Sequence, residues 1–535
     1  MSPDTTRAAA PSAMAPFGHR AFTLLWVATV VSNIGTWMND VGAGWLMTEL
    51  SPSPLMVAAV QSATTLPVFL FALVAGALAD IVDRRRLLLT VNLAMALAAT
   101  LLAILVQFGL MTPSLLLLFT FLFGTGAAFM APAWQAVVPA LVPRSELSSA
   151  IALNSMGINV SRAIGPALAG VLIVAAGLAA PFAVNAASFV AILAALLWWR
   201  PHAEEKTGLP PERVFGAVRL GLSFAAASRP LRATVTRAAA FFIFASAFWA
   251  MLPLIARDVL AGGPTLYGLL MGAVGAGAVL GALALPVLKA RWGADGTVAA
   301  GTIGTALVLV LLAVVPVQGV ALAAAAVAGV SWIAVLSSLN VSAQTALPDW
   351  VRARGLSIYL TVFFGAMAMG SLLWGQVAAS FGISGALLVA AAGALAMLPL
   401  VTRFRLSEGA AINHVPSMHW PAPILFDGAD AAKGPVIIRV EYRVGAPERA
   451  AFAQLMTELS SSRRRGGGYR WTLMQDAADP NRFVEEWLEG SWLDHQRHHA
   501  RVSEADRALQ QKIAELLGLD ASPPAEHFLT PRLSP

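Results

Sequence analysis

Twelve long apolar stretches separated by charged connectors constrain this chain more than any other feature of its sequence. A helix of about 20 apolar residues, rising 1.5 Å per residue, crosses a bilayer hydrocarbon core of about 30 Å. Such stretches occupy residues 22–48, 55–79, 87–109, 114–138, 149–175, 181–199, 234–256, 265–288, 296–315, 319–343, 355–379 and 383–402. Only 12% of the 535 residues are charged, against about 25% in soluble domains. A water-soluble fold is therefore excluded for most of the length.

The basic residues of the connectors gather on one side of the predicted membrane. The connectors on the other side contain a single basic residue, Arg257. Because cytoplasmic connectors are enriched in Lys and Arg, this asymmetry predicts a multi-pass protein of the plasma membrane, the bacterial cytoplasmic or inner membrane, with both termini in the cytoplasm. The lipid bilayer is thus the expected partner of the basic residues, and nucleic acid is not. The basic connector residues are Arg84, Arg85, Arg86, Arg144, Arg200, Lys206, Arg213, Arg219, Arg229, Arg232, Lys289, Arg291, Arg352 and Arg354.

Connector length and composition divide the chain into six parts. We expect a cytoplasmic N-terminal tail (1–20), an N-terminal six-helix bundle (21–199), a cytoplasmic central loop (200–233), a C-terminal six-helix bundle (234–403), a linker (404–434) and a soluble domain (435–535). Apolar residues from Val214 to Ala225 have helical spacing. They predict either an amphipathic helix on the inner membrane surface or an ordered helix of the loop.

A short repeat links the two predicted bundles. Gln135 and Pro139 end the fourth stretch, and Gln344 and Pro348 end the tenth, 209 residues later. A proline at a helix exit is common, but these two lie at equivalent places in the two halves. The repeat predicts a duplication, with a substrate site where the halves meet.

The connector between the second and third stretches carries a motif, GALADIVDRRR, that begins at Gly76. Gly76 permits close helix contact, Asp80 ends the helix and the arginines hold the loop at the cytoplasmic face. The segment resembles the signature loop of the major facilitator superfamily at Gly76, Leu78, Ala79, Asp80, Arg84 and Arg85. The resemblance implies a conformational latch made by Gly76, Asp80, Arg84 and Arg85. The alternative is that Asp80 and the arginines only determine the topology.

The fifth stretch contains RAIGPALAG from Arg162 to Gly170, preceded by Gly157. It resembles the Gly-Pro motif of exporters in the same superfamily, which implies that Gly157, Gly165, Pro166 and Gly170 let this helix bend and pack tightly. Packing alone is the alternative, because glycine and proline are frequent in membrane helices. In the fourth stretch, Thr120 stands where the family's motif has an arginine. The residue expected to relay protons in that helix is therefore missing.

Two charged residues lie deep within the predicted spans. Arg162 is about 20 Å and Asp40 about 27 Å from the inner face at 1.5 Å per residue. A charge at such depth is costly and marks a functional site by default. We expect an Asp40/Arg162 pair that lines a cavity, with Asp40 titrating and Arg162 holding an anionic substrate or the deprotonated carboxylate; Asn33 is a further cavity candidate. In the alternative, Asp40 lies in the outer vestibule and Arg162 makes only structural hydrogen bonds.

The C-terminal part has the pattern of a soluble α+β domain. Residues 436–444 alternate as a strand, Phe452 to Leu459 follow helical spacing, RRRGGG from Arg463 predicts a turn, two further strands follow, and a helix runs to about Leu517. This order predicts a cytoplasmic ferredoxin-like unit, and it looks like the small domain of antibiotic-biosynthesis monooxygenases. Dimerisation, as a homodimer, or regulation is expected of this domain. His495, His498 and His499 are interpreted as a solvated or core helix face, and no metal site or catalytic residue is predicted.

The whole pattern predicts an all-α membrane protein with twelve transmembrane helices in two six-helix repeats, the major facilitator fold, plus the soluble domain. It resembles the transmembrane secretion effector group of that superfamily, which is related to an enterobactin exporter. The resemblance implies a secondary transporter, not an enzyme, that exports a small hydrophobic, siderophore-like or drug-like molecule by alternating access, driven by proton antiport. No cofactor is expected. The chain lacks a GxxxxGK[ST] phosphate loop, so ATP is not its energy source, and without cysteine it has no Cys-ligated zinc or iron–sulfur cluster. A membrane-tethered monooxygenase-like enzyme is the alternative, and aromatic residues such as Trp37, Phe242 and Trp249 are candidates for the lining of an apolar cavity.

Overall fold

The computed structural model describes residues 12, 14–200, 214–406, 417, 419–421, 423–426, 434–520 and 523–529. Most of the predicted N-terminal tail, much of the central loop with Lys206 and Arg213, and most of the linker lie outside these residues, as does the side chain of Asp80. The described chain divides into two compact units. The first consists of residues 1–209, 235–340 and 359–404, and the second of residues 210–234, 341–358 and 405–535.

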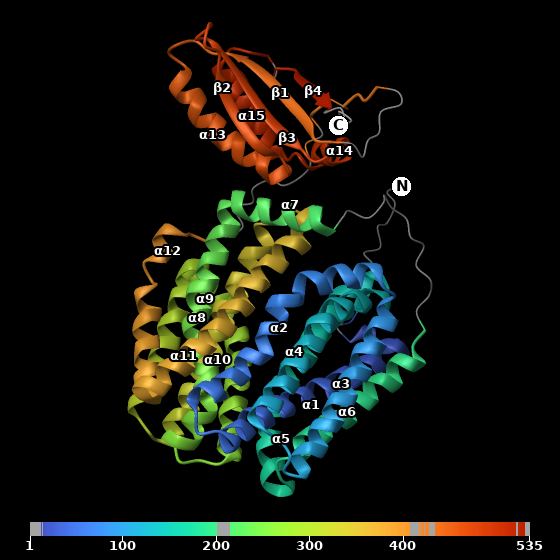
Figure 1. The fold of residues 1–535 in the computed structure, drawn as a ribbon, viewed down its shortest axis with the longest axis vertical. Helices are drawn as coiled ribbons and strands as arrows, with labels where there is room; N and C mark the ends of the chain where they lie inside the picture. Colours follow the sequence, from blue (N-terminus) through green and yellow to red (C-terminus); the bar gives the residue numbers. More distant parts are fainter. Residues whose placement is uncertain are drawn as a thin grey trace, which may run out of the picture. The chain divides into compact units, whose positions relative to one another are not determined.

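The first half of the membrane part is a bundle of six helices, which Figure 1 draws in blue to teal. They are α1 (Arg20–Leu50), α2 (Pro54–Ile81), α3 (Arg84–Gln107), α4 (Pro113–Val137), α5 (Leu147–Ala176) and α6 (Ala180–Trp198). Residues suited to helix starts set their boundaries. Thr112 accepts a hydrogen bond from the amide of Leu115 before α4, and Asp83 accepts one from the amide of Arg86 before α3. Proline in the first turn of α2, α4 and α6 costs no hydrogen bond there.

Two of the helices described in the second half are longer than any helix of the first half. The elements of this half are α8 (Arg229–Leu254), a π-helical turn (Ile255–Val259), α9 (Pro264–Val314), α10 (Gln318–Thr345), α11 (Arg352–Ala396) and the short α12 (Leu400–Arg403). Helix α9 has 51 residues and α11 has 45. Each contains one glycine with a left-handed backbone, Gly293 at φ 67° and Gly382 at φ 77°, a conformation that favours glycine.

Ten helices among the described residues are long and apolar enough to cross a membrane. The prediction of a mostly helical, multi-pass membrane protein is therefore confirmed. α9 and α11 each cover two of the predicted apolar stretches, and their internal glycine breaks at residues 293 and 382 fall in or beside the predicted connectors.

The C-terminal part of the second unit is built on a four-stranded antiparallel sheet with the order β2-β3-β1-β4. Its elements are β1 (Val436–Arg443), α13 (Arg449–Gly466), β2 (Tyr469–Gln475), β3 (Arg482–Glu489), α14 (Trp492–Arg501), α15 (Glu504–Leu516) and β4 (Ala525–Leu529). Alternate residues of β1 are buried, and they form the core with α13 and two tryptophans, Trp487 and Trp492. The predicted first three strands are thus confirmed.

Two predictions for this part were wrong or incomplete. The three arginines from Arg463 belong to α13, which ends at Gly466, because only Gly467 has the left-handed backbone (φ 114°) that stops the helix. The strand β4 was not predicted, since its five residues, AEHFL, do not alternate. It pairs antiparallel with β1, with His527 opposite Ile438.

The second unit also contains two segments that lie outside the C-terminal part in sequence. The helix α7 (Val214–Ala227) is the helix expected in the central loop, and it packs against α13. The hydroxyl of Ser223 donates a hydrogen bond of 3.2 Å to the carbonyl of Arg464. Trp350 contacts Phe224 on one side (centroids 5.8 Å apart), and the guanidinium of Arg501 lies 4.4 Å from its ring. The contacts of α7 favour the loop-helix interpretation.

Candidate functional site

Helix α5 is held close to α1 by side-chain hydrogen bonds and by small residues. The hydroxyl of Ser161 donates to the carbonyl of Val30 at 3.1 Å, and the indole of Trp26 donates to the carbonyl of Leu153 at 2.9 Å. A Cβ atom added at Gly165 would lie 2.6 Å from Cβ of Trp37. One added at Gly157 would lie 2.7 Å from Val30. Both glycines are therefore required by the close approach of the two helices.

The opposite face of α5 meets α9, so α5 joins the two bundles. A Cβ atom at Gly170 would lie 2.7 Å from the carbonyl oxygen of Pro264. In the reverse direction, one at Gly268 would lie 2.5 Å from the carbonyl oxygen of Pro166, and one at Gly275 would lie 2.8 Å from Cα of Ala163. Backbones thus touch along this line, which we call the α5/α9 seam, defined by residues 163–170 and 264–275.

Arg162 directly precedes the seam on α5 and lies beside Trp37. Its guanidinium carbon is 5.5 Å from the centre of the Trp37 ring, within the range of a cation–π contact. The Nε atom is buried and has no hydrogen-bond partner among the described residues. Arg162 is therefore a charged group in an apolar helix whose hydrogen-bonding capacity is not fully used.

Asp40 lies one helical turn beyond Trp37 on α1, and α9 approaches it. The ring of Tyr267 on α9 stacks on that of Trp45 on α1, with the ring centroids 6.4 Å apart. A Cβ atom at Gly44 would lie 2.8 Å from the Tyr267 hydroxyl oxygen. Asp40, Arg162 and Tyr267 therefore come from three helices that meet where the two bundles join.

The predicted Asp40/Arg162 pair is not formed as a direct contact. No hydrogen bond or ion pair joins the two side chains in the described part of the chain, and Arg162 lies on the Trp37 ring instead. Asn33, the third cavity candidate, is half-buried on α1. The coupling role of these three residues stays a prediction.

An ion pair in the membrane part was missed by the sequence reasoning. Nη1 of Arg237 on α8 donates to the carboxylate of Asp295 on α9, and the Arg237 side chain is buried. Asp295 follows the break at Gly293 by two residues. The sequence signal was present, because an arginine three residues inside the predicted seventh span needs a partner.

The predicted latch loop is tied to its own bundle through Arg85. Its Nε atom donates to the carbonyl of Leu196 and Nη2 to that of Leu197, both at 2.8 Å, which satisfies carbonyls at the C-terminal end of α6. Gly76 makes no close helix contact, because nothing among the described residues lies within 4 Å of a Cβ atom added there. The described residues thus show no close contact at Gly76, and Arg84 is half-buried.

The repeat residues occupy equivalent ends of α4 and α10. Gln135 lies two residues before the end of α4, and Gln344 one residue before the end of α10. A short 3₁₀ turn follows each helix, Val138–Ala140 with Pro139 inside it and Asp349–Val351 directly after Pro348. The local structure of the two segments is thus alike.

Aromatic side chains of α8, α10 and α11 form one cluster in the second half. The ring of Phe242 lies 4.3 Å from Phe363 and 5.2 Å from Trp332, and Trp332 lies 5.1 Å from Trp249. Phe242 is buried, whereas the other three rings are partly exposed. Phe242 and Trp249 were predicted cavity candidates; Trp332 and Phe363 were missed, because their contacts join helices far apart in the sequence.

In the C-terminal part, Arg463 and Glu485 are buried and contact each other. Arg463 contacts Glu485 through Nε and Oε1 at 3.0 Å, and Glu485 also accepts hydrogen bonds from Tyr442 and Trp471 at 2.9 Å each. Burial raises the pKa of the Tyr442 hydroxyl, and the charge of Glu485 raises it further. The hydroxyl therefore stays protonated as a donor to Glu485.

A second buried carboxylate, Glu489, holds two of the histidines of α14. Its oxygens contact Nδ1 of His495 at 3.0 Å and Nδ1 of His498 at 2.6 Å, and Trp487 donates to it at 2.8 Å. Burial alone would raise the pKa of Glu489, but the charge of His498 and the hydrogen bonds from both histidines outweigh it and lower this pKa below its usual range. His495 and His498 are thus core residues rather than a solvated face.

Comparison with known proteins agrees with this arrangement of helices. The sequence profile described as a transmembrane secretion effector matches residues 11–534. The chain belongs to this family of major facilitator transporters. It is thus a membrane transporter, with apolar helices that cross a membrane several times.

Relatives of this secretion effector include three named transporters. It is 26% identical to the enterobactin exporter EntS of Salmonella choleraesuis over 68% of this chain and 86% of the relative. It is 24% identical to the multidrug efflux pump Tap of Mycolicibacterium fortuitum over 67% of this chain and 90% of that protein. The match to the staphyloferrin A transporter of Staphylococcus aureus is 25% identical and spans 48% of this chain but only 64% of the relative.

Solved structures place the secretion effector in the same fold as other transporters. A structure of the nucleoside transporter NupG superposes with a TM-score of 0.60 and 12% identity, covering 72% of this chain and all of that one. A bacterial homologue of the lysosomal transporter Spinster, in an inward-facing and occupied conformation, superposes with a TM-score of 0.56 and 15% identity over 73% of this chain and 98% of that one. At these identities the likeness concerns the fold alone.

Proposed function

We propose that this secretion effector exports siderophore-like or apolar drug-like molecules across the bacterial cytoplasmic membrane by alternating access, as a proton antiporter. The names of its relatives, which include a siderophore exporter and a multidrug efflux pump, support the substrate class. The basic connectors support cytoplasmic termini.

Twelve spans in two six-helix bundles are part of this proposal. A continuous helix of 51 residues, as α9 is counted, would measure about 77 Å, more than twice the hydrocarbon thickness. The left-handed glycines at 293 and 382 divide α9 and α11 into two segments each. Ten helices with two internal breaks then supply twelve crossings.

The single observation that carries the proposal is the contact between the bundles. Along the α5/α9 seam, and where Gly375 of α11 faces Leu55 and Ala58 of α2, small residues let backbones approach without interlocking side chains. Contacts of this kind separate at low cost, because few side chains must change rotamer. Both contacts involve helix ends remote from the basic connectors, so we assign this structure to a state closed toward the outside.

Asp40 and Arg162 lie beside the part of the molecule that must open. We propose that, when the seam separates, Arg162 leaves Trp37 and binds either the ionised Asp40 or an anionic group of the substrate. Protonation of Asp40 from outside would then favour release. The partly exposed rings of Trp249, Trp332 and Phe363 provide an apolar surface for the rest of the substrate.

The remaining motif residues have supporting roles in this proposal. Gly157, Gly165, Pro166 and Gly170 give α5 its two close contacts, and the loop with Gly76, Asp80, Arg84 and Arg85 latches one state. The order β2-β3-β1-β4 supports a ferredoxin-like C-terminal domain. We assign it regulation or homodimerisation rather than a monooxygenase activity.

Efflux in cells and uptake into inverted vesicles test the function. We expect Asp40→Asn and Arg162→Gln to abolish export of a hydrophobic dye and of a catecholate siderophore, and an uncoupler to abolish it in the unchanged protein. Asp258→Asn is the matched control, because Asp258 pairs with Arg257 on an exposed connector. Full uncoupler-sensitive efflux by both variants would rule out the coupling role, and export that ignores the uncoupler would rule out antiport.

A further inference from the structure

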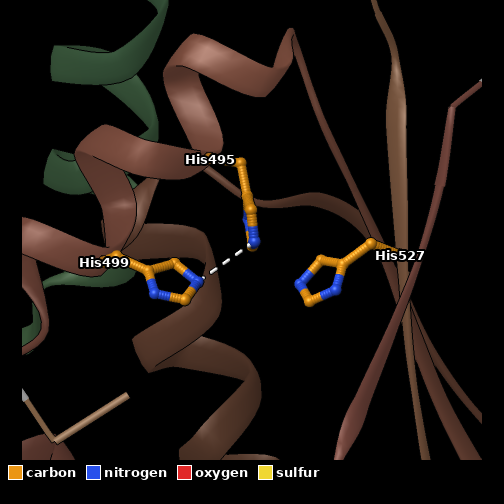
Figure 2. A group of neighbouring side chains, drawn as sticks. All are labelled: His495, His499 and His527. Carbon is orange, nitrogen blue, oxygen red and sulfur yellow. Dashed lines mark hydrogen bonds between the residues drawn. The ribbon is translucent and has the colours of Figure 1, made fainter. Parts of the chain in front are cut away.

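Three histidines of the C-terminal part point ring nitrogens at one spot. His495 and His499 come from α14, and His527 comes from the edge strand β4 (Figure 2). One ring nitrogen from each lies within 4.8 Å of the others. The Nε2 atoms of His495 and His499 are 3.1 Å apart. We propose that these three histidines bind a divalent transition-metal cation of the zinc class, at a site that goes beyond the proposed transport function and does not depend on it.

The distances fit such an ion. Imidazole nitrogens bind Zn²⁺ at about 2.0–2.1 Å, so two of them in a tetrahedral shell are about 3.3 Å apart. The His495 and His499 nitrogens are already close to that separation, and a ring movement of about 1 to 2 Å brings His527 into place. Three imidazoles leave the fourth position to water, and a ligand set without carboxylates disfavours Mg²⁺ and Ca²⁺.

Glu489 sets the tautomer that a metal ligand needs. Its Oε2 atom lies 3.0 Å from Nδ1 of His495, and both side chains are buried. When the carboxylate accepts a hydrogen bond from the Nδ1–H group of His495, the Nε2 atom carries no proton and its lone pair faces the cluster. This carboxylate–histidine–metal arrangement is the usual support of a metal-binding histidine.

The surroundings keep the other two rings neutral. Burial is the largest of the causes that lower the pKa of His499 to about 3, and the neighbouring His495 and His498 act in the same direction. Burial, and to a smaller extent the neighbouring His495, lowers the pKa of His527 to about 4. Neutral imidazole is the form that coordinates metal. The rings of Trp492 and Trp420, at 5.6 Å from His527 and 4.8 Å from His499, close the site with apolar surface.

Co²⁺ titration of the purified, chelator-treated full chain in detergent tests the proposal. We expect one equivalent to give the intense visible absorption of tetrahedral Co²⁺, and Zn²⁺ to displace it. His499→Gln and His527→Gln should each weaken binding at least about ten-fold, and Glu489→Gln about ten- to hundred-fold. His19→Gln is the matched control with unchanged affinity, because His19 contacts Glu146 at the start of the membrane part.

A second measurement separates binding from folding. Zn²⁺ should raise the thermal unfolding temperature of the unchanged protein by mass action, and it should not raise that of a folded His499→Gln/His527→Gln double variant. The absence of a saturable Co²⁺ spectrum from the unchanged protein would overturn the proposal, whatever the variants do. An unchanged spectrum and affinity in the double variant would overturn it as well.

Discussion

Arg463 in the C-terminal part and Arg162 in the membrane part differ in how completely their guanidinium groups are hydrogen-bonded. Arg463 and Glu485 are almost wholly inaccessible, and Tyr442 and Trp471 use the remaining oxygen positions of the carboxylate. Arg162, in contrast, lies among apolar helices with a buried Nε atom that has no partner in the described part of the chain. The Glu485 carboxylate thus has a partner at both oxygens, whereas the Nε atom of Arg162 has none among the described residues.

The difference indicates what each charge is for. A buried pair with all its hydrogen bonds made is a structural element, because removal of one partner leaves a costly charge behind. A buried charge that lacks partners lowers stability in the state observed, and it persists where another state or a ligand supplies the partner. Arg237, which is paired with Asp295 in the membrane part, lies between these cases.

The largest expected effect is in the C-terminal part, where Glu485→Ala leaves Arg463 buried without its carboxylate. Loss of one partner of a buried pair costs about 3–5 kcal/mol. Hydrogen exchange should therefore accelerate by on the order of a hundred-fold or more in the amides of β1 and β3. The neighbouring Glu486→Ala is the control, because Glu486 pairs with Arg439 at 3.3 Å on an accessible face and its loss costs about 1 kcal/mol or less. Equal effects of the two variants would contradict the comparison.

An intermediate effect is expected from Arg237→Met in the membrane part. Asp295 would lose the hydrogen bond that the guanidinium of Arg237 donates to it, which should lower the free energy of unfolding by about 1–3 kcal/mol. Thermal unfolding in detergent should show this loss, and the double variant Arg237→Met/Asp295→Asn should recover part of it, since the two changes are coupled. A double variant as unstable as the sum of the single ones would show that the pair contributes nothing.

The smallest expected change in stability is that of Arg162→Met, which removes the incompletely satisfied charge. The free energy of unfolding of this variant should stay within about 0.5 kcal/mol of that of the unchanged protein, or rise. Efflux should fall at least about ten-fold, because the α5/α9 seam then lacks the positive charge beside it. Arg291→Met, on an exposed connector, controls for loss of an arginine as such. A clear loss of stability with unchanged efflux would make Arg162 a structural residue and remove the contrast.

Much of the fold follows from local sequence signals. Apolar length predicts the helices of the membrane part, and alternation predicts β1, because each is a property of consecutive residues and of the solvent around them. The strand β4 escaped this reasoning, since a short edge strand is stabilised by its pairing with β1 rather than by its own pattern. The arginines of α13 were misplaced for a related reason, because Arg463 contacts Glu485 and Arg465 contacts Asp506, and no local pattern reveals either partner.

The candidate site depends even more on distant contacts. Asp40 and Arg162 could be named from their cost in an apolar helix, but their separation by the Trp37 contact could not. No local pattern predicts that Trp332 and Phe363 contact Phe242, or that Trp332 contacts Trp249. None predicts that Asp295 pairs with Arg237. His527 lies 28 residues beyond His499, and only the antiparallel pairing of β4 brings it to the other two histidines.

By itself, the sequence determined that this chain crosses a membrane several times, because hydrophobic transfer depends on residue composition over about 20 positions. Its motifs gave the resemblance to a transporter family. The tertiary structure alone decided which charges have partners, where the bundles touch and which histidines converge. These properties depend on distances between helices and strands far apart in the chain, and such distances are set by packing rather than by any local pattern.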